Sequence, residues 1–508
     1  MGALSARPQL GRHLTIALAG GLIIGIIVWG VLWAIDSTSY DIWGGLVVGP
    51  FLLLATLPLA RRAAKHENDP RLAYLIIAAL ILKFVASCVR YYVAFVVYDG
   101  SADAGVYIRE GGWFAENLRQ GMILYEPERG GGSGTHFIRQ LTGWVFFFTG
   151  TSRIGGFFVF SWFGFLGQYL AYRAFRIAVP HGLHRRYALL VFLMPTLLYW
   201  PASIGKDAWM LLTIGLGAYG AARILTHRPS GYAIFALSLV GSAAVRPHVT
   251  ALLAAALAAS FLLRRSPEGS IFTLVAKIVG TVLVLGGTIF AIQAAEERFG
   301  VPGEGVEGAA QVIEETAEQT RGGGSEYTPT NPRSIVDVPR AVFTVLFRPL
   351  PHEAHNAQAL ITSMEGMFLL ALFAFSWQRL RRLPLEAWQT PYVMFASAYS
   401  LMFTIAFASI GNFGILARQR SQGFLLLLVI LALPTLKEIA AIRESSERKM
   451  GQQAVTGRVL IPVPAEPEAS RGRSTDAAML DPGPLAGQGT ELVIDLPDGS
   501  TRPPGEPD

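Results

Sequence analysis

Several short polar motifs in this chain carry residue types that could bind an anion or transfer a proton. Two residues are candidates for acid–base catalysis, because a carboxylate or an imidazole can accept a proton from a hydroxyl group: Asp103 and His248. Six cationic residues are candidates for binding a phosphate group: Lys206, Arg246, Arg348, His352, Arg418 and Arg420. Four more are expected to support them: Arg90, Tyr107, Asp207 and Glu353.

The run from Ser203 to Asp207 has the composition of an anion site at the start of a helix. Backbone N–H groups at a helix N-terminus, together with a lysine side chain, can hold a phosphate group. The alternative is structural, because Asp207 could neutralise Lys206 in an ion pair.

Two further motifs have both a functional and a structural interpretation. In Arg246-Pro247-His248 the proline explains a tight turn, whereas the arginine and the histidine are not needed to form it. Asp103 could act as a general base, or it could equally well cap the helix that follows it.

Arg418 and Arg420 bracket a single residue after an Asn-Phe-Gly turn. Two guanidinium groups at this spacing suit a pyrophosphate, because arginine donates hydrogen bonds in a planar fork. The alternative is that both side chains reach toward lipid headgroups. His352 and His355 flank Glu353, but their spacing in a proline-broken loop is weak evidence for a metal site. We therefore predict no metal ligands, and a divalent cation stays open as a cofactor.

The composition is that of a membrane protein. Of the 508 residues, 52% are hydrophobic and only 15% are charged, and the mean hydropathy of +0.41 is too high for a soluble protein of this length. Apolar runs of roughly 17 to 25 residues have the length that crosses the hydrocarbon core as a helix. The short alternating strands of a membrane barrel are absent from the sequence. The single cysteine, Cys88, allows no disulfide within the chain.

The apolar runs predict an all-α transmembrane bundle of about twelve spans. The predicted spans cover residues 14–35, 44–60, 72–98, 154–179, 187–201, 208–224, two spans that meet at Arg246-Pro247-His248, 271–291, 360–377, 391–410 and 424–436. Clusters of Lys and Arg then fall in every second loop, which places these loops and both termini in the cytoplasm. Topology thereby explains the net charge of +6, and nucleic acid is not expected as a partner.

This arrangement divides the chain into three parts. Residues 1–13 form a cytoplasmic N-terminus, residues 14–436 a transmembrane domain, and residues 437–508 a largely disordered cytoplasmic tail. Two large loops, 99–139 and 293–359, lie outside, and the stretch 335–347 is expected to form a helix along the outer interface. The candidate motifs all emerge on this outer face, where a membrane protein does not normally concentrate Arg and Lys. An anion site on the outer face is therefore predicted.

Among the ionisable residues within predicted spans, Lys83, Arg90 and Glu365 bear on the predicted site. Lys83 and Arg90 are seven residues apart, and therefore on one face of a helix, whereas Glu365 lies near the start of another span. Charged groups inside a membrane usually face the protein interior or a cavity. We expect Arg90 to approach the outer site and Lys83 to pair with Glu365.

As a set, these motifs resemble those of the bacterial polytopic glycosyltransferases of the GT-C type and of the related O-antigen or exopolysaccharide polymerases. The resemblance covers roughly residues 70 to 435 and rests on Asp103 with Tyr107, the segment from Pro201 to Asp207, Arg246-Pro247-His248 and Arg418-Gln419-Arg420. It implies a GT-C-like fold in the cell membrane, embedded in membrane lipid. It also implies transfer of a sugar from a polyprenyl-phosphate-linked donor to a glycan acceptor, in cell-surface polysaccharide synthesis, with Asp103 in the place of the catalytic carboxylate. Asp99 and Asp103 depart from the spacing of the acidic pair that many of these enzymes carry.

Other classes of protein remain as alternatives. A polymerase would bind polyprenyl pyrophosphate through the outer arginines and use His248 or Asp103 as its base. A lipid-linked saccharide flippase would place charge near the bilayer midplane and often shows internal repeats, whereas here the charges cluster at one face. A scaffold protein would leave the outer motifs unexplained.

Overall fold

A computed structural model describes residues 39–100, 102–123, 133–263, 325–330 and 334–441, with isolated positions at 28, 32, 35, 36, 286, 332 and 444. All of them belong to the first of two compact units, Met1–Ser445. Within these residues the secondary structure is helical, apart from an isolated antiparallel bridge between Glu326 and Asn412. The all-α class is therefore confirmed. Three parts of the prediction lie largely outside the described residues: the first and ninth predicted spans, residues 293–324 of the second outer loop, and nearly all of the tail.

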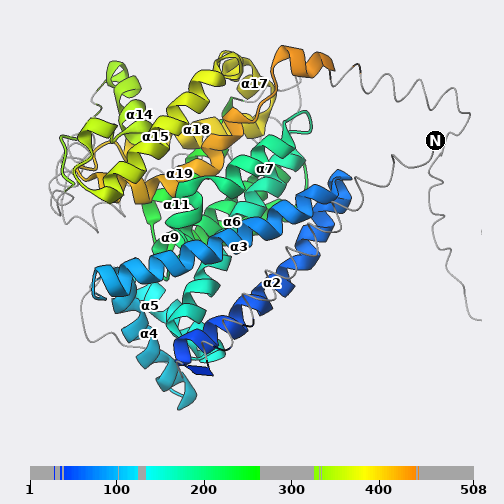
Figure 1. Ribbon diagram of the computed structural model, residues 1–508. Helices are drawn as coiled ribbons and strands as arrows, with labels where there is room; N and C mark the ends of the chain where they lie inside the picture. Colours follow the sequence, from blue (N-terminus) through cyan, green and yellow to red (C-terminus); the bar gives the residue numbers. More distant parts are fainter. Residues whose placement is uncertain are drawn as a thin grey trace, which may run out of the picture. The chain divides into compact units, whose positions relative to one another are not determined.

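Among the described residues, six helices are long and apolar enough to cross a membrane (Figure 1). They are α2 (Tyr40–Glu67), α3 (Pro70–Tyr92) with the π-helical turn η1 (Val93–Val97), α6 (Arg153–Ala178), α9 (Lys206–Leu225), α15 (Ala357–Phe375) and α19 (Phe413–Leu431). Three shorter apolar helices coincide with three further predicted spans: α10 (Ser230–Ala243), α11 (Pro247–Leu262) and α18 (Pro391–Ala406). These helices indicate a multi-pass membrane protein, while the count of twelve spans stays a prediction.

The fifth predicted span is interrupted. It consists of α7 (His184–Leu193) and α8 (Pro195–Tyr199), which are separated at Met194. Pro195 explains the break, because proline lacks a backbone N–H group and disfavours helical geometry in the residue before it. The short helices α16 (Trp377–Leu380) and α17 (Leu383–Gln389) follow α15 at its C-terminal end.

The outer loop 99–139 contains more helix than the sequence suggested. The predicted helix after Asp103 is present as α4 (Asp103–Arg119), but a second helix, α5 (Ser133–Thr149), begins inside the region that was expected to be a loop. The two helices pack tightly, since a Cβ atom on Gly111 would lie 2.7 Å from Thr142. Figure 1 shows α4 and α5 together near the end of α3.

Two helices at the C-terminal side position the remaining motifs. The helix expected at 335–347 is present as the 3-10 turn η2 (Ile335–Asp337) and α14 (Val338–Phe347), followed by the turn η3 (Pro351–Glu353). The prediction that the last span begins at about residue 424 is wrong, because α19 begins at Phe413. The Asn412 side chain caps it by accepting hydrogen bonds from the N–H groups of Gly414 (2.8 Å) and Ile415 (3.1 Å). Arg418 and Arg420 therefore lie within a helix and not in a loop.

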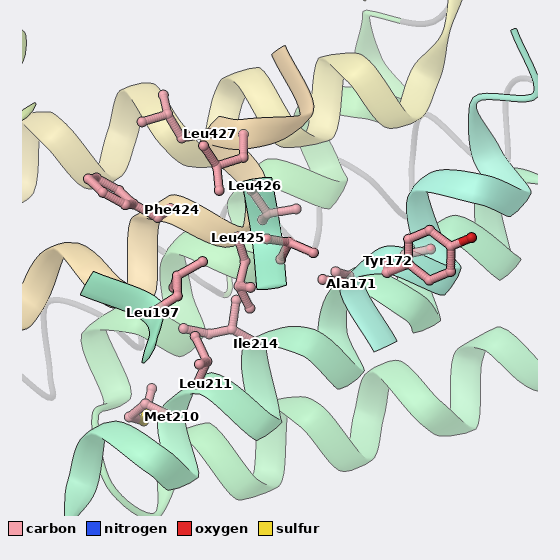
Figure 2. Packing of buried hydrophobic residues seen from close by; sticks show 14 of the residues in the cluster. Ala171, Tyr172, Leu197, Met210, Leu211, Ile214, Phe424, Leu425, Leu426 and Leu427 are labelled. Carbon is pink, nitrogen blue, oxygen red and sulfur yellow. The ribbon is translucent and has the colours of Figure 1, made fainter. Parts of the chain in front are cut away.

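The core is built around α6 and α9, which pack against each other along most of their lengths. The contact is unusually close because of two glycines: a Cβ atom on Gly167 would overlap the Leu211 carbonyl, and one on Gly215 would overlap the Gly167 backbone. Figure 2 shows the adjoining apolar layer, in which Leu211 and Ile214 of α9 lie near Leu425 of α19.

Ion pairs between helices lie at two opposite ends of the bundle. At the first, which we call the basic end, Glu67 at the end of α2 pairs with Arg176 of α6, and Arg379 pairs with Glu438 at 2.6 Å. Arg186 also donates to Ser376 there, at 2.8 Å. These contacts join the clusters that the sequence placed together on the cytoplasmic side. The second, which we call the site end, holds the N-terminus of α9 and the start of α4.

Candidate functional site

Four charged residues from distant parts of the sequence meet at the site end. Asp103 is the first residue of α4, Asp207 the second residue of α9, Arg246 the residue before α11, and Arg418 lies in the second turn of α19. Three of these residues, Asp103, Asp207 and Arg246, lie at the starts of helices, and these helix starts lie at the same end of the bundle. We call these four residues the charge cluster.

Arg418 is the centre of the charge cluster. Its Nη1 atom donates to Asp103 Oδ2 at 2.9 Å, and its Nε atom donates to Asp207 Oδ2. Arg246 Nη2 donates to the other oxygen of Asp207, Oδ1, at 3.3 Å. One buried carboxylate is thus held by two guanidinium groups, which is the arrangement that offsets the cost of burying a charge.

The charge cluster runs from a buried side to an open side. The exposed fraction of the side chain is 4% for Asp207, 10% for Arg246, 26% for Arg418 and 62% for Asp103. Asp103 is therefore accessible to a ligand from solution, while Asp207 is enclosed by protein.

The buried side of the cluster keeps hydrogen-bond donors without acceptors. Within the described part of the chain, Arg246 Nη1 is buried and has no partner. The N-terminus of α9 beside it has no side-chain cap, so its first N–H groups are not used by a capping side chain. A Cβ atom on Gly205 would lie 4.0 Å from Arg418 Nη2, so this helix start borders the same guanidinium group. Donors of this kind favour an anionic ligand.

Tyr107 and Lys206 complete the surroundings through α5. The Lys206 Nζ atom donates to Thr135 Oγ1 at 2.8 Å, and the Tyr107 side chain also hydrogen-bonds to Thr135. Burial, and then the nearby Asp103 carboxylate, raise the pKa of Tyr107 to about 12, so that its hydroxyl group keeps its proton at neutral pH. Thr135 was not among the predicted residues, because the sequence gave no indication of α5.

Arg90 lies on the edge of the same region, as expected. Its guanidinium group lies 5.0 Å and 5.2 Å from the ring centroids of Tyr199 and Trp200, and Nη2 donates to Ser203 Oγ at 3.4 Å. With Lys206, Arg246 and Arg418 it makes four cations around two carboxylates. These six groups together carry an excess of two positive charges, which attracts anions.

Arg348 has a different environment from the one predicted. Its Nε atom donates to both carboxylate oxygens of Glu353, at 2.9 Å and 3.1 Å. Its guanidinium group also covers the stacked rings of Tyr327 and Phe413, with centroid distances of 4.8 Å and 5.3 Å. These contacts hold the loop after α14 against the start of α19. His352, in the same loop, is exposed.

Arg420 contacts α14, and His248 contacts an aromatic ring. Arg420 is buried and its Nε atom donates to Val345 O of α14 at 2.6 Å, on the side of α19 away from Arg418. Residues two apart on a helix point in different directions, so the expected grip of one pyrophosphate by both arginines is wrong. His248 is exposed, and its ring packs against Phe407 with a centroid distance of 5.7 Å.

The expected ion pair between Lys83 and Glu365 is also wrong. Lys83 Nζ donates to Gln168 Oε1 (2.9 Å) and to Leu197 O (2.6 Å), whereas Glu365 Oε1 accepts from the N–H group of Thr196 (2.7 Å). The two side chains instead bind neighbouring residues of α8, where the helix break leaves N–H and C=O groups without helical partners.

Within the described residues, no group of three or more His, Cys, Asp or Glu side chains is placed to hold a metal ion. The two carboxylates of the charge cluster are bridged by Arg418, so a cation between them would have to displace a guanidinium group.

We found no matching protein-family model, no matching curated protein and no matching solved structure for this chain. The class of protein is therefore defined by the fold and the site alone: a helical membrane protein with a charge cluster at one end of the bundle.

The contacts of Arg348 predict a structural role. Arg348→Met should leave the Glu353 carboxylate without its main partner and lower the free energy of unfolding in detergent by about 1–3 kcal/mol. Thermal unfolding measured by intrinsic fluorescence checks this. Arg340→Met, at an exposed position of α14, is the matched control. An unchanged melting temperature together with lost activity would instead favour ligand binding by Arg348.

The same pair predicts a dependence of stability on pH. Burial of Glu353 opposes its ionisation, but hydrogen bonds from Arg348 and from the Leu350 N–H group outweigh this and hold the pKa of the carboxyl group below its usual range. The stabilisation is therefore fully present above the ordinary glutamate pKa of about 4.3, and it is lost as the pH falls through the lowered pKa of the folded protein. Melting temperatures recorded from pH 7 down to pH 3 should fall more steeply for the wild type than for Glu353→Gln.

Proposed function

We propose that the chain is a membrane glycosyltransferase that uses a polyprenyl-phosphate-linked sugar or saccharide donor in cell-surface polysaccharide synthesis. The observation that carries the proposal is the charge cluster, which combines an accessible carboxylate, Asp103, with a buried arginine, Arg246, that keeps an unused donor. Sugar transfer from a phosphate needs a base for the acceptor hydroxyl group and cations for the leaving phosphate.

The proposed step assigns each residue a role. Asp103 accepts the proton of an acceptor hydroxyl group as that oxygen forms a bond to the anomeric carbon of the sugar. The bond between this carbon and the phosphate oxygen breaks, and its electron pair stays on the phosphate. Arg246, Arg418 and Lys206 neutralise the charge that develops there, and the Tyr107 hydroxyl group can donate a further hydrogen bond. The apolar helices around the site end leave the polyprenyl chain in contact with lipid.

The proposal includes the orientation and the full membrane topology. The site end would face outward, because the basic end carries the Lys and Arg clusters that favour the cytoplasm. About twelve spans would bring both termini to the cytoplasmic side, and the arrangement would be GT-C-like.

A polysaccharide polymerase acting on polyprenyl pyrophosphate is the second candidate. The excess of two positive charges among these four cations and two carboxylates favours it, because a pyrophosphate diester carries two negative charges whereas a phosphate diester carries one.

The lipid-linked glycans of a deletion strain test the proposal. Loss of one sugar from a lipid-linked intermediate supports the transferase, and accumulation of single repeat units supports the polymerase. Intermediates trapped on the inner face would identify a flippase and contradict both. An unchanged glycan profile would contradict a role in this synthesis.

Complementation of that strain tests the charge cluster. Arg246→Ala should lower product formation by about 10²-fold, because a buried donor that stabilises the leaving phosphate is lost. Arg246→Lys should retain part of the activity, and Arg340→Ala should retain all of it. Mass spectrometry of the extracted glycans gives the yield, and immunoblotting gives the amount of protein in the membrane. Full activity of Arg246→Ala at normal abundance would remove the anion site from the mechanism.

A further inference from the structure

The segment from Met194 to Gly205, which we call the elbow, connects α7 to the start of α9, where Lys206 and Asp207 lie. It contains only five helical residues, those of α8, and residues 200–205 are irregular. The elbow is nevertheless enclosed by protein, and Leu197 and Ala202 are fully buried. Irregular backbone in apolar surroundings needs hydrogen-bond partners from neighbouring elements.

One face of α3 supplies these partners. Lys83 Nζ donates to Leu197 O at 2.6 Å, and Ser87 Oγ donates to Ala202 O at 2.9 Å. Arg90, three residues further on, reaches Ser203 and the two aromatic rings before it. The spacing of four and three residues places all three side chains on the same side of the helix. The elbow is thus held along most of its length by a single polar stripe.

Burying the Lys83 amine at this position costs free energy. Lys83 is fully buried, and no carboxylate lies within ion-pair distance of it among the described residues. Its second partner is a neutral amide, Gln168 Oε1, and Gln168 is itself fixed by donating to Val191 O at 2.6 Å. A methionine would fill similar space without burying an amine. What the lysine adds is a hydrogen bond to the elbow.

A glycine on α6 makes the fit close. A Cβ atom on Gly164 would lie 3.0 Å from Pro201 Cβ and 3.3 Å from Lys83 Cε. The backbone of α6 therefore borders the point at which the lysine side chain and the elbow pass each other. The elbow has little room to shift as long as the bond from Lys83 is present.

We propose that Lys83 is a positioning residue that, with Ser87, fixes the elbow and thereby sets the place of Asp207 in the charge cluster and of Lys206 beside it. The catalytic part of this inference rests on the proposed function, whereas its structural part does not. A displacement of the elbow would be passed directly to the start of α9, and small displacements of catalytic groups have large effects on rate.

A buried thiol on the elbow tests the structural part. In a Cys88→Ala background, Ser203→Cys places a nearly isosteric thiol at a buried position. We expect this thiol to react slowly with a water-soluble maleimide, and Lys83→Met to raise the rate at least about tenfold. Leu82→Met, on an exposed face of the same helix, is the control and should leave the rate unchanged. An equally slow reaction in Lys83→Met would overturn the inference.

Kinetics test the catalytic part. Lys83→Met should lower kcat about tenfold or more and change KM for the lipid-linked donor much less, because it displaces groups and removes none of them from the site. Ser87→Ala should act in the same direction with a smaller effect, and it serves if Lys83→Met does not fold. If Lys83→Met made the Ser203→Cys thiol react fast but kept the wild-type kcat, Lys83 would have no positioning role in catalysis. Full activity of Arg246→Ala would refute the proposed function instead, and the thiol rates would still decide the question of the elbow.

Discussion

Asp103→Asn is expected to lower glycan transfer by about 10³-fold while leaving the amount of folded protein in the membrane unchanged. The carboxylate is the only accessible one in the charge cluster, and a general base contributes about 10²–10⁴-fold to a rate. Asparagine keeps the shape and a hydrogen-bond acceptor for Arg418, but it cannot take a proton. Because most of the side chain is exposed, the ion pair with Arg418 adds little stability.

The measurement is the rate of product formation in membranes that contain equal amounts of each variant. Glu116→Gln on the same helix is the matched control, since that carboxylate lies in an exposed pair with Arg119 far along α4. If Asp103→Asn retained more than about a tenth of the wild-type rate, Asp103 could not be the base.

Arg418→Met is expected to abolish activity and also to destabilise the protein. Asp207 is buried and loses the stronger of its two guanidinium partners, which leaves a charge that Arg246 alone must compensate. Breaking a buried ion pair from one side costs about 3–5 kcal/mol. The expected result is a lower melting temperature in detergent and loss of product.

A second variant separates the two effects. Arg418→Met combined with Asp207→Asn removes the uncompensated charge and should recover much of the stability without recovering activity. Recovery of both would mean that the arginine serves only to neutralise Asp207. A melting temperature of Arg418→Met equal to that of the wild type would contradict the burial that the structure gives to Asp207.

The meeting of Asp103, Lys206, Asp207 and Arg246 at one end follows from the sequence, because alternate loops of a helical bundle lie at opposite ends. Hydropathy located most of the long helices, because these helices are the long apolar runs of the sequence. The residue types alone could not tell which cations would remain available to a ligand. The phosphate role of Arg348 stays a prediction, but its contacts with a glutamate five residues later and with two aromatic rings were not foreseen.

Other errors have local physical causes. The Asn412 cap starts α19 about three turns earlier than hydropathy suggests, so that Arg418 and Arg420 lie on different faces of a helix. Helix α5 begins in a stretch of glycine and polar residues, so its N-terminal part, with Thr135, was assigned to a loop. Lys83 was expected to pair with a carboxylate, yet it donates to the Leu197 carbonyl group, which has no helical partner because α8 ends at Tyr199.

The glycine contact between α6 and α9 has a mechanical consequence for the enzyme we propose. Where backbone meets backbone, no side chain can rotate to absorb a change of spacing, so α9, and with it Asp207, is held at a fixed distance from α6. Asp103, in contrast, lies at the exposed start of α4. Adjustment to substrates of different size would therefore fall to Asp103, at the exposed side of the charge cluster, while Asp207 stays in place.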